Sequence, residues 1–278
     1  SATTASGSVF LGADAGGTVA TGNQNIAIGY DAMKGGATTG DNNIAIGASA
    51  GDALTSGKNN VLMGAGIAGA LTTGTENVVL GFEALYTADG GESDNVIIGK
   101  HAGYYINDDS ADGNVIIGKG AAQGGAADIS SCVVIGTNAM DATGNNAQTG
   151  TVAIGYHALT RLTSGTKNTA VGYLSQDYNR TGVNNTSVGE ESLSQLGHDD
   201  SDNNTAVGFQ AMRSAGTPNN NDAAQNVAVG SKALTAILDG DNNTALGYEA
   251  GKAITTGGAN VILGSFAGDG LQTTYNHV

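Results

Sequence analysis

The chain has 278 residues, enough for one or two ordinary domains, and its 46 glycines do not follow the Gly-X-Y period of collagen. Apolar residues make up 40% of the chain and recur regularly, which excludes a disordered protein. The formal net charge of -15 argues against a nucleic-acid partner, because phosphate binding needs clustered cations, and no apolar run is long enough to predict membrane insertion.

One motif recurs from one end of the chain to the other: a short apolar run that closes on glycine and usually opens with asparagine. The first copy is Val9-Phe10-Leu11-Gly12 and the last is Val261-Ile262-Leu263-Gly264. Most steps between the closing glycines are 17 to 19 residues. Such a period predicts stacked coils. We expect a single repeat domain over residues 1–278, with coils at about 8–270 and a tail, or the start of a further segment, at 271–278. The closing glycines are Gly12, Gly29, Gly47, Gly64, Gly81, Gly99, Gly118, Gly136, Gly155, Gly172, Gly189, Gly208, Gly230, Gly247 and Gly264.

Each coil is numbered here from its closing glycine as position zero. Positions -3 and -1 hold strand-forming residues, as Ile26 and Ile28 do, and side chains two apart share a face. We therefore expect these two positions to point into the coil. Position +3 is usually small and position +7 is often apolar, as in Ala50 and Leu54. These features predict a second short strand that faces the first across a thin interior.

The regular recurrence of glycine and asparagine along the chain predicts the turns. Glycine at zero suits a turn that needs positive φ or has no room for a Cβ. Asparagine at -4 suits a ladder of side-chain amides between stacked coils. The exceptions are Ser8, Cys132 and Thr151, and we expect Cys132 to pack as a small apolar residue.

Position -2 is apolar in every copy but one, although it should face away from -3 and -1. A strand that is apolar on both faces is expected to be buried on both faces. We therefore predict that this row forms the interface of a homotrimer. It follows that Ile98→Asp would block folding, whereas Ala170→Asp would block assembly. The predicted interface comprises Phe10, Ala27, Ala45, Leu62, Val79, Ile97, Ile116, Val134, Ala153, Ala170, Ser187, Ala206, Ala228, Ala245 and Ile262.

The repeat, as in the segment from Asn25 to Ala32, resembles the head repeats of YadA-like trimeric autotransporter adhesins. Longer stretches, such as Gly247 to Gly257, look even more like repeats of bacteriophage tail fibres and related receptor-binding fibres. The resemblance covers about residues 8–270. It implies an all-β, left-handed parallel β-roll of about fifteen coils that assembles as a homotrimer. The resemblance is weaker evidence for function than for fold, because proteins with different functions share this β-roll.

No catalytic set is visible, so we expect no enzyme and no cofactor. The Cys and His spacing does not suit zinc, and the glycines follow the coil period rather than a phosphate loop. A depolymerase on a β-solenoid would need paired carboxylates in a groove, and the carboxylates here are scattered.

Longer steps between glycines mark insertions, which are the candidate ligand-binding segments. Their carboxylates suit calcium chemically, but we favour solvated loops and predict no metal site. We expect the aromatic residues at +1, such as Tyr156, to cover the turn and pack on the next coil. The candidate ligand-binding residues are Tyr104, Tyr105, Asp108, Asp109, Asp112, Asp199, Asp200 and Asp202.

Two functions fit these observations. The first is a non-enzymatic segment of a phage tail fibre, which gives rigid length and contributes to recognition of a glycan or protein receptor on the host surface. The second is the head of a bacterial surface adhesin that binds matrix or glycans. The first implies a location in the virion and the second a location on the cell surface.

Overall fold

The computed structural model describes residues 6–17, 21–125, 129–144, 147–196, 201–214 and 221–278. Within these ranges there is no helix, and so none that could cross a membrane. The chain divides into two compact units, Ser1–Ile135 with Gly144–Thr149 and Gly136–Thr143 with Gly150–Val278. The prediction of one continuous domain stays a prediction.

Every repeat contributes one strand of three residues, and the described residues hold fifteen of them. The first unit contains β1 (Val9–Leu11), β2 (Ile26–Ile28), β3 (Ile44–Ile46), β4 (Val61–Met63), β5 (Val78–Leu80), β6 (Val96–Ile98), β7 (Val115–Ile117) and β8 (Val133–Ile135). The second contains β9 (Val152–Ile154), β10 (Thr169–Val171), β11 (Thr186–Val188), β12 (Thr205–Val207), β13 (Val227–Val229), β14 (Thr244–Leu246) and β15 (Val261–Leu263).

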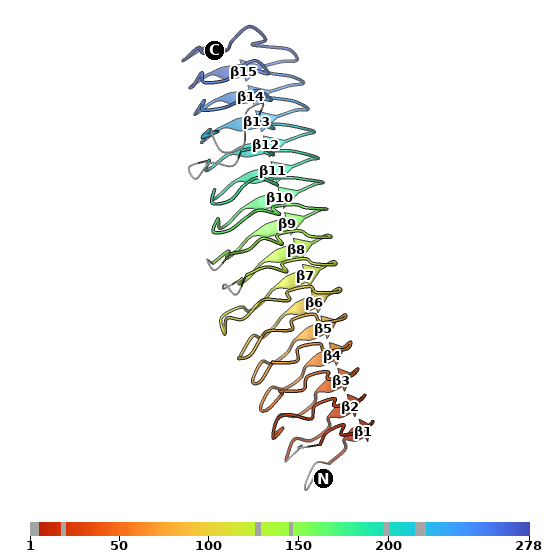
Figure 1. The fold of residues 1–278 in the computed structure, drawn as a ribbon. Coiled ribbons are helices and arrows are strands. Elements are labelled where there is room, and N and C mark those ends of the chain that lie inside the picture. Colours follow the sequence, from red (N-terminus) through yellow and green to blue (C-terminus); the bar gives the residue numbers. More distant parts are fainter. Residues whose placement is uncertain (1–5, 18–20, 126–128, 145–146, 197–200, 215–220) are drawn as a thin grey trace. The chain divides into compact units, whose positions relative to one another are not determined.

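Within each unit the strands follow one another in chain order and pair in parallel (Figure 1). The register joins equivalent positions of neighbouring repeats, so that Ala27 lies opposite Ala45 and Ala153 opposite Ala170. Each turn of the chain contributes one strand, and these strands pair in parallel in the same register. This arrangement defines an all-β parallel β-solenoid. The expected fold class is confirmed at this level.

The inner and outer faces of the strand are the reverse of the prediction. The residues at -2 point into the coil, and those at -3 and -1 face outward. Phe10 is half-buried, and its ring lies against Gly16 inside the coil. The other fourteen residues of the predicted trimer interface are at most 3% exposed within the single chain, so they cannot contact another copy. These are Ala27, Ala45, Leu62, Val79, Ile97, Ile116, Val134, Ala153, Ala170, Ser187, Ala206, Ala228, Ala245 and Ile262.

The wall opposite the strand is not a second strand in any described repeat. Its residues at +2 and +4 adopt left-handed backbone, as Asp31 (φ 56°) and Met33 (φ 51°) do, and a strand cannot contain such an alternation. The residues of this wall nevertheless fill the interior as predicted. Ala32 at +3 and Leu54 at +7 are fully buried.

The asparagine ladder is confirmed. The side chain of Asn60 donates from Nδ2 to Asn43 Oδ1 at 3.0 Å and to the Gly74 carbonyl at 2.8 Å. Its own Oδ1 accepts from the backbone N–H and the Nδ2 of Asn77. The same pattern joins Asn226, Asn243 and Asn260 in the second unit. Each amide therefore ties three consecutive turns together and satisfies groups that are buried from water.

The closing glycine is needed for both predicted reasons: its φ is positive, and there is no room for a Cβ. Gly47 has φ 137°, and a Cβ on it would lie 2.3 Å from the Gly64 carbonyl oxygen. Stacked turns thus approach one another closely at this position, where any side chain would force them apart.

Candidate functional site

The outward face of the sheet is an apolar surface that the fold leaves partly exposed. Fifteen strands present thirty residues at -3 and -1, and all are apolar except Thr169, Thr186, Thr205 and Thr244. Nine of the thirty are exposed by more than a third, and Leu11 and Leu263 reach 65%. The sheet of each unit therefore carries two apolar rows on its outside.

The turns that follow β5 and β6 hold a cluster of aromatic rings. Tyr86 stacks on Tyr104, with ring centroids 5.1 Å apart, and Tyr104 meets Tyr105 edge-on at 4.6 Å. His101 contacts Phe82 and Tyr104, and its Nε2 lies 3.1 Å from Glu83 Oε2. The structure thus brings both predicted tyrosines together with Tyr86, which the sequence analysis did not single out.

Aromatic residues at +1 pack on the next coil where it offers a ring. Tyr156 and Tyr173 stack at 5.3 Å with an interplanar angle of 9°. Both remain nearly half exposed. These rings therefore cover the turns, as expected, and also form part of the outer surface.

Tyr86 forms one wall of a groove of about 490 Å³ in the first unit. The opposite side carries Asp52, and the floor is Gly66, Gly69 and Ala70, where one coil lacks the side chains that its neighbours carry. Ser49, Thr87 and Asp89 complete the lining. An aromatic wall beside carboxylates and hydroxyls is a surface that suits a sugar ring.

The predicted acidic residues have three different roles. Asp108 accepts hydrogen bonds from the hydroxyl and the backbone N–H of Ser110, which lower the pKa of the Asp108 carboxyl. Asp112 and Asp202 each accept a backbone N–H from the preceding coil, at 2.7 Å in both cases. Asp199 and Asp200 lie outside the described residues.

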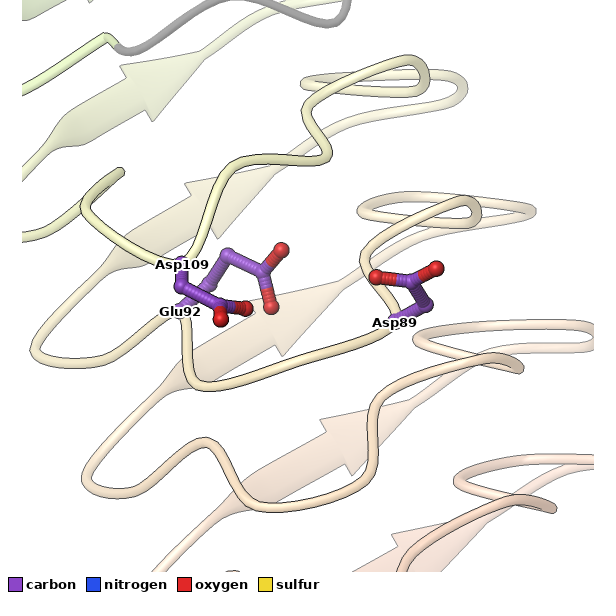
Figure 2. Close-up of side chains that lie close together, drawn as sticks. All are labelled: Asp89, Glu92 and Asp109. Atoms are coloured by element: carbon purple, nitrogen blue, oxygen red, sulfur yellow. The ribbon is translucent and has the colours of Figure 1, made fainter.

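Among those of the predicted acidic residues that the structure describes, Asp109 alone joins a cluster of other carboxylates. It lies with Asp89 and Glu92, and each residue offers an oxygen within 4.8 Å of the others. Figure 2 shows the carboxyl groups of Glu92 and Asp109 side by side, with that of Asp89 facing them. Glu92 is fully buried, whereas the other two are exposed.

Burial raises the pKa of the Glu92 carboxyl above its usual range. The backbone N–H groups of Glu92 and Gly90 act against this shift, and the negative charges of Asp109 and Asp89 add to it. The folded protein therefore disfavours the charged form of the Glu92 carboxyl.

The sequence analysis missed Asp89 and Glu92 because they lie outside the insertion that contains Asp109. A signal was nevertheless present. Position -7 is glycine in eight coils and acidic only at Glu92. An acidic residue at a position that is usually glycine is a signal that the local environment of Glu92 differs from that in the other coils.

The fold defines a repeat protein of the parallel β-solenoid class. Comparison with protein families, with curated proteins and with solved structures finds no match. The class therefore rests on the fold alone.

Proposed function

We propose that this chain is a non-enzymatic segment of a homotrimeric fibre, in which the outward face of the sheet packs against the same face of two further copies. The observation that carries the proposal is the outward face itself, with 26 apolar residues among 30 positions. Monomeric proteins rarely expose contiguous apolar surface on this scale.

A second copy fits this face better than an unrelated partner does. The apolar rows repeat at every turn of the solenoid, at the spacing of about 4.8 Å between neighbouring strands. A partner that covers them evenly must repeat at the same spacing, and another copy of this chain does so. Symmetric self-association is also the commonest form of protein assembly. Three copies and a left-handed winding are expected from the similarity to trimeric adhesin heads and tail fibres.

This proposal retains the predicted trimer and moves its interface from position -2 to positions -3 and -1. A tail fibre on a phage particle is the favoured setting, and an adhesin head on a bacterial surface is the alternative. Both use the solenoid as rigid length, and trimerisation multiplies weak contacts with a receptor.

Light scattering at several protein concentrations tests the assembly. We expect a mass three times 27.3 kDa that persists on dilution. Ile98→Asp, which places a charge on the outward face, should reduce that mass, whereas Asp94→Asn on an exposed turn should not. A wild-type protein that runs as a monomer at all concentrations would refute the proposed interface.

Recognition of a surface glycan is a further proposal, and the groove beside Tyr86 supports it. Tyr86→Ala removes the aromatic wall without entering the coil interior, because this ring is 39% exposed. We expect the variant to lose binding on a glycan array, and Tyr173→Ala, a half-exposed ring outside the groove, to retain it. Equal binding by both variants would exclude this groove.

A further inference from the structure

We propose that the turns after β5 and β6 bind one calcium ion between the carboxylates of Asp89, Glu92 and Asp109. Asp89 and Glu92 lie in the turn between β5 and β6, and Asp109 lies in the next turn along the stack. The site is separate from the outward sheet face, so it does not depend on the proposed assembly.

The buried carboxyl group of Glu92 is the first argument. Its Oε2 accepts a long hydrogen bond, 3.3 Å from the Gly90 backbone N–H. Its Oε1 is buried and has no hydrogen-bond partner. Among the described residues, no lysine, arginine or histidine forms an ion pair with any of the three carboxylates. A buried, unpaired carboxylate is costly unless a cation compensates it.

The second argument is that two facing positions, +7 and -7, depart from the repeat together in this coil. In the two coils before this one, a leucine at +7 lies against a glycine at -7: a Cβ on Gly57 would be 2.8 Å from Leu54 Cδ1, and one on Gly74 would be 2.7 Å from Leu71 Cδ1. In the next coil the leucine becomes Ala88 and the glycine becomes Glu92. The smaller residue leaves space where the larger, acidic one enters.

The position of Asp109 is the third argument. Its Oδ1 accepts the Gly91 backbone N–H at 3.1 Å. The same oxygen lies only 1.6 Å from where a Cβ on Gly90 would be. The carboxylate thus reaches the cluster because residue 90 has no side chain, and the hydrogen bond to Gly91 holds it there.

The number and type of protein ligands favour calcium over magnesium. Calcium takes six to eight hard oxygen ligands at about 2.3–2.6 Å, so two opposed ligands are about 4.8 Å apart. The three carboxylates offer oxygens within that span, and water supplies the remaining ligands. Magnesium usually keeps several waters and binds through one or two carboxylates, so a set of three protein carboxylates suits calcium better.

Isothermal titration of the full chain with calcium chloride tests the site. We expect one calcium per chain and a rise in melting temperature on adding calcium, because an ion that binds only the folded state stabilises it. Glu92→Gln keeps the size of the side chain and removes its charge, and should weaken binding at least about tenfold. Asp94→Asn removes an exposed charge two residues away and should leave binding unchanged.

A double variant separates ion binding from folding. Ala88→Leu with Glu92→Gly restores the residues that the preceding coils carry at +7 and -7. It should fold with an unchanged circular dichroism spectrum and bind no calcium. The proposal is overturned if the wild type takes up no calcium at millimolar concentration. It is equally overturned if Glu92→Gln or the double variant binds as tightly as the wild type.

Discussion

At the scale of single residues, Ser187 is a polar exception at an apolar position of the repeat, and it is nevertheless buried. It is the one polar residue at -2, and it lies fully buried among Ser175, Ser192 and Gln176. Its hydroxyl lies 2.5 Å from Ser175 Oγ and accepts from Gln176 Nε2 at 2.9 Å, while Ser175 Oγ lies 3.2 Å from Ser192 Oγ. Buried polar groups are stable when their hydrogen bonds are met, and here several neighbouring positions changed together to meet them.

Asp177 provides a test of burial by pH. Its Oδ1 is buried without a hydrogen-bond partner, and burial raises the pKa of this carboxyl to about 6 against the nearby Arg161 charge. The folded state therefore holds a proton between about pH 4 and 6 that the unfolded state releases, so this group favours folding as the pH falls through 6. We expect Asp177→Asn to raise the melting temperature at pH 8 and to change it little at pH 4.

The control for this prediction is Asp239→Asn, which alters an exposed carboxylate of the same unit. It should shift the melting temperature little at either pH. A shift for Asp177→Asn that is the same at pH 4 and pH 8 would show that the carboxyl is not perturbed in the folded protein.

At the scale of the element, a three-residue strand has one inward residue between two outward ones. The inward residue is alanine in seven of the fifteen strands, because the opposite wall comes close and leaves little volume. In these seven strands both outward residues are larger than the inward alanine. A pattern of hydrophobicity alone therefore assigns the faces the wrong way round, since it places the bulkier pair inside.

Two neighbouring substitutions in β10 test which face of the strand points into the coil. Ala170→Asp places a charge in the closed interior and should abolish cooperative unfolding, because an unpaired buried charge costs several kcal/mol. Val171→Asp places the same charge on the half-buried outward face and should keep the circular dichroism spectrum of the solenoid. This reverses the expectation from sequence, in which Ala170→Asp affected only assembly. An Ala170→Asp variant that melts like the wild type would restore the original assignment.

At the scale of the whole molecule, charge and apolar surface are segregated. The chain carries 25 acidic and 10 basic residues, yet none of the thirty residues at -3 and -1 is charged. Net negative charge keeps such a chain soluble and repels other copies. The uncharged sheet face is the surface on which copies can meet at the least electrostatic cost, which is why the proposed assembly uses it.

The sequence by itself determined the architecture at the level of the repeat. Fifteen closing glycines, the asparagines at -4 and the period of 17 to 19 residues predicted stacked turns and the amide ladder, and the structure confirms both. These features are readable because each is repeated, and because glycine and asparagine are restricted to few backbone conformations.

Only the tertiary structure decided which face of the strand is inside and which acidic residues meet. The first depends on the wall opposite the strand, where left-handed backbone at Asp31 and Met33 replaces the predicted second strand and the buried Met33 side chain fills the interior. The second depends on stacking, since Glu92 and Asp109 come together only when one turn lies on the next. Local patterns report backbone conformation, whereas side-chain direction across a coil and contacts between coils arise from packing over longer distances.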